Sequence, residues 1–324
     1  MSKNIYVQIS GRLGNQLFSY AFAKKIQMSV AGEIICNFYE VNKTSLLKKD
    51  LSFKDELSKF NLDYTNLEEM ESFRNLVLNN GSLDQRFLYL IFACVRRIWP
   101  MEDYNKKYLA KINRWFARLL SRKGLYVTPF LTGHFEKSSK KSLFIYGKFE
   151  NAELFEDIEK NLQKSIVAKE VISDKNLNMS YEIQKNESVC ISIRRGDFLS
   201  KEYMEDFFQC DEKYFKKAIN IMNKKLKRPT FFVFSDDIEY ASIFANKMLK
   251  HNKVFVELEG NTVEEKLMLM RGCKHFIISN STFSWWAQFL GDFDEKLVIG
   301  PKHWFPENGK YQNDKLIQNN WIKI

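Results

Sequence analysis

The chain has 324 residues, 45% of them apolar and 15% aromatic, with 28 phenylalanines. This length exceeds one domain of ordinary size, and so much core material excludes an intrinsically disordered protein. The formal net charge of +10 fits an anionic substrate, an anionic membrane surface or a nucleic acid, and does not choose among them. Five scattered cysteines without a C-x-x-C pair favour reduced thiols over disulfides or zinc ligands.

The start of the chain lacks the apolar stretch of a secretory signal, so we expect a cytoplasmic protein. The longest uncharged apolar run, residues 87–95, is far shorter than the ~20 residues that span a bilayer. Within residues 86–123, basic residues alternate with bulky apolar ones such as Trp99, Trp115 and Phe116, as in helices that lie on membranes. We expect peripheral contact with an anionic membrane. The alternative is two amphipathic helices that pack on a domain and keep a wet basic side.

Apolar spacing in the first half of the chain predicts a β-turn-α-β unit followed by a mostly helical stretch. The expected strands are 5–9, 33–37, 125–128 and 143–149, and the expected helices are 15–30 and 151–167. Residues 168–187 are polar and without a strong period, which is typical of a linker.

The second half alternates regularly between strand and helix patterns. The expected strands are 188–193, 230–234, 254–257, 275–279 and 297–299, and the expected helices are 211–225, 237–249, 262–271 and one from about 284. This alternation predicts an α/β fold of two Rossmann-like domains, with parallel sheets facing across a cleft. We place the domains at 1–167, with a helical insertion about 40–123, and 168–324. Ligands are expected at the carboxyl ends of the strands.

The turn from Gly11 to Gln16 joins the first strand to a helix. Its glycines allow backbone to approach a ligand beside free N–H groups at the helix start, although the dinucleotide motif G-x-G-x-x-G does not align here. The alternative is an ordinary tight turn in which Asn15 caps the helix.

The apolar strand 188–193 ends in Arg194-Arg195-Gly196-Asp197. Two guanidiniums at the end of a buried strand are costly to leave unpaired, and their planar forks suit a diphosphate, so we favour anion binding over a surface basic pair. Asp197 is a candidate for holding one arginine in place.

Two more strand ends carry polar side chains. Ser235-Asp236-Asp237 has an acidic pair that suits a metal, a ribose, the donor edge of guanine or a helix cap, and capping needs only one carboxylate. The turn 280–284 is rich in hydroxyls and opens into a helix, which suits phosphate oxygens. No His and carboxylate cluster has metal-ligand spacing, and we interpret the Asp292-Phe293-Asp294 segment as a solvated loop.

These segments, in this order, resemble glycosyltransferase family 11, the α-1,2-fucosyltransferases. The family hallmarks G-x-L-G-N-Q-(M/L)-F, H-x-R-R-G-D, F-S-D-D and N-S-T-F-S-W-W correspond to Gly11–Phe18, Ser192–Asp197, Phe234–Asp237 and Asn280–Trp286. The resemblance spans nearly the whole chain. It implies a GT-B-like fold with the acceptor on the N-terminal domain and the GDP-sugar on the C-terminal domain. It also implies inverting transfer of fucose from GDP-β-L-fucose to a glycan hydroxyl such as galactose O2, without a divalent metal or other cofactor.

Two positions depart from the family pattern. Ser192 stands where the family usually has His, in a region near the nucleotide in related fucosyltransferases, so contacts to guanine or phosphate must differ. The segment Tyr146-Gly147-Lys148-Phe149-Glu150 resembles the family's G-Y-(F/W)-Q-S but has Glu150 for Gln and Asn151 for Ser. The acceptor preference is therefore open.

Negative charge develops on the departing GDP during fucosyl transfer, so fixed cations must take it when no metal is present. We assign this role to Arg194 and Arg195, and name Asp197, Glu202 and Glu150 as candidates for the base. The expected donor-binding residues are Gly14, Asn15, Gln16, Ser192, Ser235, Asp236, Asp237, Asn280, Ser281, Thr282, Phe283 and Ser284.

Two alternatives remain open. One is a glycosyltransferase that uses another nucleotide sugar; the other is a non-catalytic protein that binds membrane or nucleic acid through its basic face. The second alternative explains the net charge but not the three ligand-like strand ends. We therefore expect GDP-fucose and a glycan acceptor as partners, and no nucleic acid. The glycan is lipid-linked in many bacterial systems.

Overall fold

The computed structural model describes residues 2–98, 107–127, 135–196, 208, 210–306 and 315–324. The chain divides into two compact units. Unit 1 comprises Met1–Ser58 and Leu62–Ile158, and unit 2 comprises Lys59–Asn61 and Glu159–Ile324. The division precedes the expected boundary at residue 167 because helix α6 (Glu159–Ser165) packs against α12 (Thr282–Leu290). Gln163 of α6 donates hydrogen bonds to two backbone carbonyls at the end of α12.

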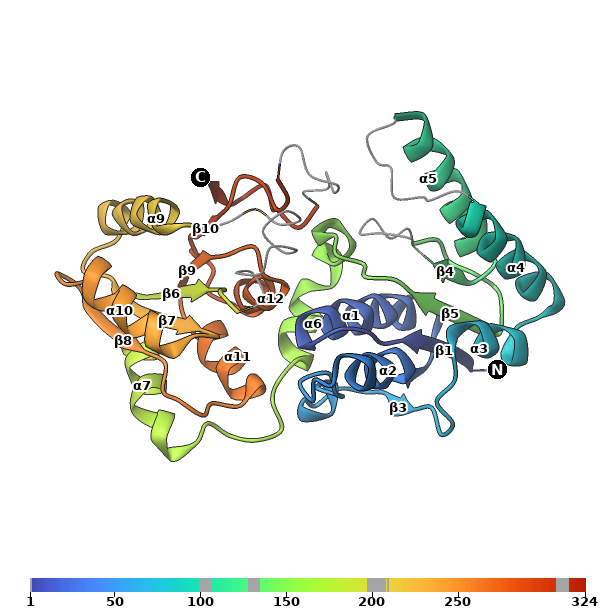
Figure 1. Ribbon diagram of the computed structural model, residues 1–324, viewed down its shortest axis with the longest axis horizontal. Coiled ribbons are helices and arrows are strands. Elements are labelled where there is room, and N and C mark those ends of the chain that lie inside the picture. Colours follow the sequence, from blue (N-terminus) through green and yellow to red (C-terminus); the bar gives the residue numbers. More distant parts are fainter. Residues whose placement is uncertain (1, 99–106, 128–134, 197–207, 209, 307–314) are drawn as a thin grey trace. The chain divides into compact units, whose positions relative to one another are not determined.

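Unit 1 is built on a five-stranded parallel sheet with strand order β3-β2-β1-β5-β4 (Figure 1). Its strands are β1 (Lys3–Gln8), β2 (Gly32–Asn37), β3 (Thr65–Asn66), β4 (Leu125–Val127) and β5 (Ser142–Tyr146). Its helices are α1 (Leu13–Val30), α2 (Tyr39–Lys48), α3 (Phe73–Asn80), α4 (Leu83–Ile98) and α5 (Lys107–Arg122).

The two faces of this sheet are covered by different helices. Side chains alternate along β1, so that Tyr6 stacks on Phe144 of β5 toward one face while Ile5 and Val7 point to the other. The Tyr6 face packs on α3, α4 and α5 through a buried cluster that includes Phe92 and Leu120. The opposite face is covered by α1, which has long apolar side chains on several sides and is buried over most of its length.

Unit 2 is built on a six-stranded parallel sheet with order β11-β10-β9-β6-β7-β8. Its strands are β6 (Ser188–Ile193), β7 (Thr230–Ser235), β8 (Lys253–Val256), β9 (His275–Ile278), β10 (Val298–Gly300) and β11 (Ile322–Lys323). Besides α6 and α12, its helices are α7 (Leu177–Lys185), α9 (Glu212–Lys225), α10 (Ile238–Met248) and α11 (Val263–Arg271). If the strands of this sheet are numbered 1 to 6 in chain order from β6 to β11, their order from the β8 edge is 3-2-1-4-5-6, which is that of a doubly wound fold.

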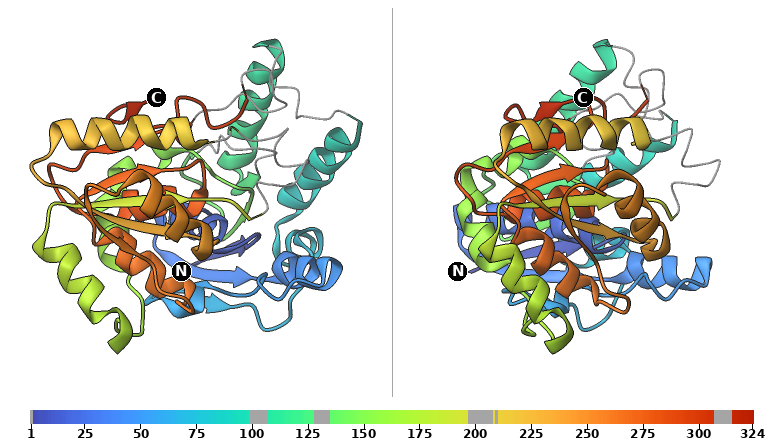
Figure 2. Two further views of the ribbon diagram at one scale, coloured as in Figure 1. Left: turned by 60° about the vertical axis from the view of Figure 1, so that its left-hand side comes forward. Right: turned by 90° about the vertical axis from the view of Figure 1, so that its left-hand side faces the viewer.

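Alternation along β6 again assigns the helices to faces. Val189, Ile191 and Ile193 pack with α9 and α10, whereas Ser192 faces α12. Figure 2 shows α9 on one side of this sheet and α7 and α11 on the other. The prediction of an α/β protein with two Rossmann-like parallel sheets is confirmed.

Three local predictions were wrong. Strand β5 ends at Tyr146 rather than Phe149, because Phe149 has a φ of 51°, which a strand does not tolerate. The expected helix 151–167 is two 3₁₀ turns, η2 (Ala152–Leu154) and η3 (Glu156–Ile158), followed by the short α6. The expected linker 168–187 contains α7 and the 3₁₀ turn η4 (Asp174–Asn176), because Met179 and Ile183 bury one side of a short helix.

Helices α4 and α5 correspond to the amphipathic stretch of the sequence. Phe116 of α5 stacks on Phe92 of α4 with ring centroids 6.0 Å apart, so this aromatic belongs to the packed side. Trp115 is 65% exposed, and Trp99 lies outside the described residues. In the part of the chain that the structure describes, no helix is both long and apolar enough to cross a bilayer.

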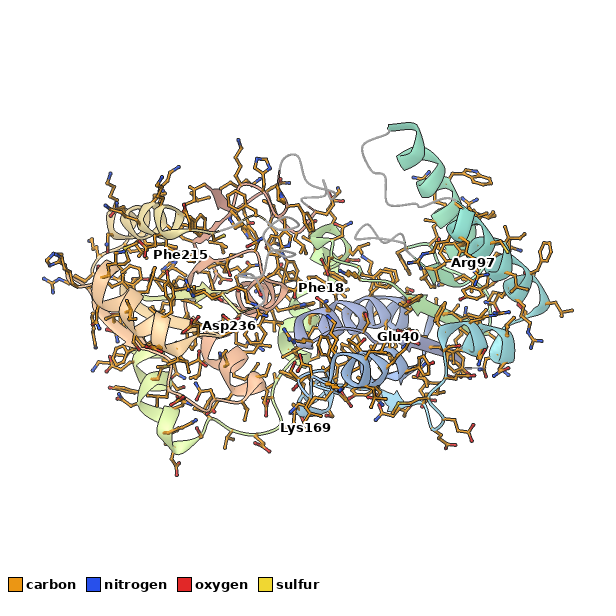
Figure 3. All side chains as sticks on the ribbon, viewed as in Figure 1. Phe18, Glu40, Arg97, Lys169, Phe215 and Asp236 are labelled. Carbon is orange, nitrogen blue, oxygen red and sulfur yellow. The ribbon has the colours of Figure 1, made fainter. Side chains whose placement is uncertain are left out.

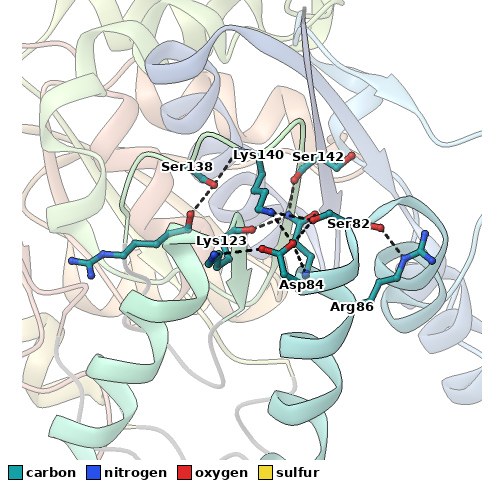
Figure 4. Close-up of polar contacts among 10 residues, drawn as sticks. Ser82, Asp84, Arg86, Lys123, Ser138, Lys140 and Ser142 are labelled. Carbon is teal, nitrogen blue, oxygen red and sulfur yellow. Dashed lines mark hydrogen bonds and ion pairs between the residues drawn. The ribbon is translucent and has the colours of Figure 1, made fainter.

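The start of α4 is fixed to the sheet by charged and polar contacts (Figure 4). Asp84 forms ion pairs with Lys140 at 2.7 Å and with Lys123 at 3.4 Å, and the hydrogen bond from Lys140 holds the pKa of Asp84 far below its usual range. Gln85 donates hydrogen bonds to the carbonyls of Lys123 and Ser142. These contacts determine which face of α4 is turned outward.

Candidate active site

The predicted site residues of unit 2 gather at one edge of its sheet. Strands β6 and β9 are neighbours, and the strand order reverses between them. In doubly wound sheets such a reversal opens a crevice at the carboxyl ends of the strands, where ligands bind. Arg194 follows β6 directly, and Ser279 follows β9. Asp236 follows β7, the other neighbour of β6, and is labelled in Figure 3.

Asp236 holds the turn after β6 at two points. Its Oδ2 lies 2.8 Å from a terminal nitrogen of Arg194, and its Oδ1 accepts a hydrogen bond of 2.8 Å from the backbone N–H of Arg195. Both side chains are about a quarter exposed, so this pair is only partly screened by water. The pair with Asp236 therefore orients the guanidinium of Arg194.

The neighbouring Arg195 is held by α10. Its guanidinium carbon lies 3.7 Å from the centroid of the Tyr240 ring, and its Nε lies 3.4 Å from Oδ2 of Asp237. The other oxygen of Asp237 accepts from the N–H of Tyr240 and caps α10. Asp237 thus caps the helix, which was one of the alternatives for the acidic pair, and Asp236 pairs with Arg194. The prediction that one of them contacts guanine or ribose stays a prediction.

Tyr240 was not anticipated from the sequence. It lies in the first turn of α10, three residues after the capping Asp237, so helical spacing from the acidic pair is the signal that points to it. Gly196 has a packing reason, because a Cβ added there would lie 2.6 Å from Oδ2 of Asp236. The R-R-G-D turn and the S-D-D turn therefore fit together as one cluster.

Ser235 lies beneath this cluster and is fully engaged with protein. Its N–H donates to Glu257, its carbonyl accepts from Lys266, and its hydroxyl accepts from the N–H of Asp237. Burial raises the pKa of Glu257, while the Lys266 ammonium at 2.9 Å opposes the rise. This ion pair, in which Glu257 is buried and Lys266 is partly exposed, was not anticipated from the sequence and fixes the end of β7. The expected donor contact of Ser235 is untested, and its side chain acts through the turn.

Ser192 bridges the reversal point of the sheet. Its hydroxyl lies 2.7 Å from that of Ser284 in the first turn of α12, and Ser279 lies 3.5 Å from Ser284. Both Ser192 and Ser284 are buried. The serine at the family's His position therefore ties β6 to α12, and the hydroxyl of Ser284 points into this contact.

The start of α12 is open compared with those of its neighbours. Helices α9, α10 and α11 each begin with a side-chain cap, whereas Ser281 makes no capping bond to α12. Ser281, Thr282 and Phe283 are partly exposed, and the buried Asn280 donates to the carbonyl of Trp304. Trp285 and Trp286 are fully buried, as expected of core residues under the turn. Backbone N–H groups at an uncapped helix start suit an anion.

In unit 1 the order reverses between β1 and β5, which places the Gly11 turn beside the end of β5. Gly11 has a φ of 73°, and a Cβ there would meet the side chain of Asn15 at 2.7 Å. Gly14 is buried and Asn15 partly exposed. The buried Gln16 amide bonds the carbonyls of Gly11 and Lys54 and the N–H of Glu56. Gln16 thus supports the turn from within.

Glu150 follows β5 and is a buried carboxyl, 6% exposed. Its neighbour Phe149 adopts a left-handed φ and stacks on Phe22 at 4.1 Å, and the side chain of Asn151 caps η2. The backbone is therefore fixed on both sides of Glu150, at a local cost typical of functional positions. Burial raises the pKa of Glu150, and Lys148 opposes the rise. Within the described ranges, Glu150 has no ion-pair partner.

Two of the remaining predicted residues fall outside the part of the chain that the structure describes, and two lie in a loop. Asp197 and Glu202 lie outside the described residues. Asp292 and Asp294 lie in an exposed loop between α12 and β10. Among the residues that the structure describes, no three His, Cys, Asp or Glu side chains form a group that could hold a metal ion.

Known proteins match this chain over its whole length. Alpha-1,2-colitosyltransferase of Escherichia coli is 27% identical over 339 residues, covering 99% of this chain and 98% of that protein. The O-antigen biosynthesis glycosyltransferase WbnK of Escherichia coli is 25% identical over 334 residues, covering 99% and 100%. A mutant of Arabidopsis thaliana FUT1 in complex with GDP aligns with a TM-score of 0.51 at 11% identity, covering 95% of this chain and 72% of that one.

The two Rossmann-like parallel sheets and the alignment with FUT1 confirm the GT-B-like fold class expected from the resemblance. A family model described as glycosyl transferase family 11 matches residues 115–324, about two thirds of the sequence. The chain belongs to glycosyl transferase family 11.

Proposed function

We propose that this enzyme transfers fucose from GDP-β-L-fucose to a glycan hydroxyl, with inversion, to form an α-1,2 linkage. The observation that carries this proposal is the cluster after β6 and β7, where Asp236 orients Arg194 and the ring of Tyr240 supports Arg195. Oriented guanidiniums match the bidentate geometry of a diphosphate. The uncapped start of α12 adds backbone donors to the same edge of the sheet.

In this mechanism the bond between the anomeric carbon and the β-phosphate oxygen breaks, and the acceptor oxygen bonds to the anomeric carbon from the opposite side. Arg194 and Arg195 take up the charge that develops on GDP, while Asp236 and Tyr240 are positioning residues. The acceptor hydroxyl loses its proton to a base. Glu150 is our choice among the described residues, because a carboxylate of raised pKa accepts a proton more readily.

We propose that no divalent metal takes part. The carboxylates of the S-D-D turn already have protein partners, since Asp236 pairs with Arg194 and Asp237 caps α10. Binding a cation there would break these contacts and set it beside two guanidiniums. The arginines supply the positive charge that a metal would otherwise provide.

A second donor, GDP-colitose, is favoured by the similarity to the alpha-1,2-colitosyltransferase. Colitose lacks one ring hydroxyl of fucose, and a site that hydrogen-bonds that hydroxyl discriminates strongly against its absence. The test is a donor panel of GDP-fucose, GDP-colitose, GDP-mannose and UDP-galactose, with turnover measured by nucleotide release and products by mass spectrometry and NMR. Highest kcat/KM with GDP-fucose and an α-1,2 product support the proposal. Preference for GDP-colitose or a UDP-sugar contradicts it.

We also propose that the enzyme attaches weakly to anionic membranes through α4 and α5. The outward face of α4 carries Leu83, Phe87, Leu90 and Cys94 at positions i, i+4, i+7 and i+11, with Leu83 82% and Phe87 65% exposed. Arg97, three residues after Cys94, is exposed and lies next along the same face of α4. An apolar stripe beside basic side chains is complementary to a bilayer of negative surface charge. We expect the protein to act on the cytoplasmic side.

Liposome sedimentation tests the attachment. Wild type should pellet with phosphatidylglycerol vesicles at low salt and less with neutral vesicles, and Phe87→Ser and Trp115→Ser should weaken pelleting. Leu46→Ser is the matched control, because Leu46 is 79% exposed on α2, outside this surface. Indifference to anionic lipid refutes attachment. Equal pelleting of all variants shows that the α4 stripe is not the contact.

A further inference from the structure

A cavity of about 280 Å³ lies in unit 1 beside α4. It is lined by Tyr89, Phe92, Ala93, Arg96 and Arg97 of α4 and by Tyr146, the last residue of β5. We call it the α4 pocket; Figure 3 labels Arg97. Its volume is near the lower limit of ligand sites and suits about one sugar unit. The pocket thus lies by the carboxyl end of β5, an inner strand of the sheet, and α/β sheets bind ligands at such strand ends.

The walls of the pocket are held by packed aromatic rings. Phe73 contacts Tyr146 at 4.8 Å and Tyr89 at 5.6 Å between ring centroids, and Phe92 stacks on Phe116. These contacts restrain the ring planes before any ligand arrives. Flat aromatic faces with a polar edge suit the apolar face and hydroxyl rim of a sugar ring.

The polar groups of the pocket have no partners within the described ranges. Neither Arg96 nor Arg97 forms an ion pair or hydrogen bond there, and neither do the hydroxyls of Tyr89 and Tyr146. Burial and the negative charge of Glu40 raise the pKa of Tyr146, and the positive charge of Arg96 acts against this rise. Arg96 acts in the same direction on Tyr89. Its charge therefore reaches both phenols.

A structural explanation covers only part of this arrangement. Cations near the end of a helix are stabilised by the helix dipole, which accounts for two arginines in the last turns of α4. It does not account for two tyrosines in the lining of the same cavity whose hydroxyls have no protein partner in the described ranges. A cavity lined by two arginines, two tyrosines and a phenylalanine has the composition of a site for an anionic sugar.

We propose that the α4 pocket binds a negatively charged sugar unit of the acceptor, with the ring against Tyr89, Phe92 and Tyr146 and the anionic group on Arg96 and Arg97. Taking the ligand to be the acceptor rests on the proposed function. The anion has two possible chemical sources. It is either a carboxylate on a sugar of the glycan or the phosphate that joins a glycan to its carrier.

Calorimetric titration of the full-length protein tests the pocket directly. The probes are methyl glucuronide, glucose 1-phosphate and the neutral methyl glucoside. We expect the preferred anionic probe to bind at least about tenfold more tightly than the glucoside, as a charge-assisted hydrogen bond requires. Preference for glucuronide assigns a carboxylate, and preference for glucose 1-phosphate assigns a phosphate. Equal affinity for charged and neutral probes overturns the inference.

Variants locate the binding. Arg96→Gln should weaken the anionic probe about tenfold, and Tyr146→Phe, which keeps the ring and removes only the hydroxyl, should weaken it less. Arg118→Gln on α5 is the control, because Arg118 is exposed and does not line the pocket. Unchanged affinity in both Arg96→Gln and Tyr146→Phe overturns the inference even where wild type binds anions.

Failure of this inference is distinguishable from failure of the proposed function. Retention of wild type on GDP-agarose and turnover of GDP-fucose test the proposed function without any charged sugar. If wild type neither binds GDP-agarose nor turns over GDP-fucose, but its binding of the anionic probe still depends on Arg96, the proposed function is wrong. The α4 pocket is then still an anion site, and its ligand is not a fucose acceptor. With an active acceptor in hand, Arg96→Gln should raise the acceptor KM more than it lowers kcat.

Discussion

The two units have the same kind of sheet, and in each the strand order reverses beside the first strand, but the two reversal points carry different chemistry. In unit 2 the charged side chains are paired, Arg194 with Asp236 and Arg195 with Asp237. In unit 1 the carboxyl of Glu150 is buried and, among the described residues, has no ion-pair partner. Paired charges hold a fixed orientation and suit binding of a charged group. A buried unpaired carboxyl exchanges a proton more easily.

The largest effect is expected at the paired arginines. Arg195→Ala should lower kcat/KM between ~100- and ~1,000-fold, because a preorganised donor to developing charge is lost. Arg195→Lys should recover little, since an ammonium lacks the planar fork and the broad contact with Tyr240. Steady-state kinetics give the measurement, with exposed Lys224→Ala on α9 as the control. Near-normal turnover in a folded Arg194→Ala, Arg195→Ala double variant removes the arginines from the mechanism.

Glu150 provides the second test, through pH. Glu150→Gln should lower kcat about 100-fold if the carboxylate is the base. Because burial raises the pKa of Glu150, wild-type activity should fall with decreasing pH at a higher pH than for an ordinary carboxyl, and this limb should be lost in Glu150→Gln. If Glu150→Gln lowers activity equally at every pH and leaves the shape of the pH profile unchanged, another residue is the base.

Stability should respond to the same substitution in the opposite sense. A raised pKa means that the folded protein holds this proton more tightly than the unfolded chain, so wild type loses stability as pH rises from about 4.5 through the raised value. Glu150→Gln has no carboxyl to titrate at this position, so its stability does not decrease with pH for this reason. Thermal unfolding should therefore show the variant gaining on wild type between acid and neutral pH.

Gly196 links the two turns of unit 2 and gives a smaller effect. A Cβ at this position would lie 2.6 Å from Asp236, so Gly196→Ala should displace that carboxylate and release Arg194. Overpacking of this kind costs about 1–3 kcal/mol, and we expect roughly tenfold weaker GDP binding by calorimetry. Gly272→Ala, also in unit 2, serves as the comparison, because Gly272 has a φ of −70° and a Cβ there would meet no atom closer than 3.4 Å. Unaltered GDP affinity in Gly196→Ala would falsify the role of Asp236 as a positioning residue.

The smallest expected effect is that of metal removal. Turnover in excess EDTA should equal turnover in buffer, and added manganese should change the rate only slightly, because arginines and helix-start donors hold the diphosphate. If EDTA abolishes activity and one divalent ion restores it, Asp236 and Asp237 are ligands of a cation. The charges of unit 2 would then not be paired as described, and the contrast with Glu150 of unit 1 would be lost.

The sequence predicted strands β6 to β10 of unit 2 closely, because each of them is a short apolar run bounded by turns. It predicted α6 and α7 poorly, since short helices buried on one narrow face have too weak a period. The arginines and the acidic pair were recognised by residue type. Their partners were not, because the pairing of Arg195 with Tyr240 and of Ser192 with Ser284 depends on how separate strand ends meet.

The segment from residue 86 to 123 shows a different limit. Its composition identified the segment as basic and aromatic, but could not tell which of its side chains pack on the domain and which face solvent. Phe116 turned out to be packed while its neighbour Trp115 is exposed. The α4 pocket was missed for the same reason, since Tyr146 comes from a strand far along the chain from Arg96.

The distribution of the cysteines makes the α4 stripe directly observable. Cys36, Cys190 and Cys273 are buried, and burial raises the pKa of the half-buried Cys210 to about 12, which leaves little reactive thiolate. Cys94 alone is exposed, on the stripe itself. A thiol-reactive fluorophore should therefore label the native enzyme at one position. Its emission would report in real time whether α4 passes from water into an apolar layer, without any engineered residue.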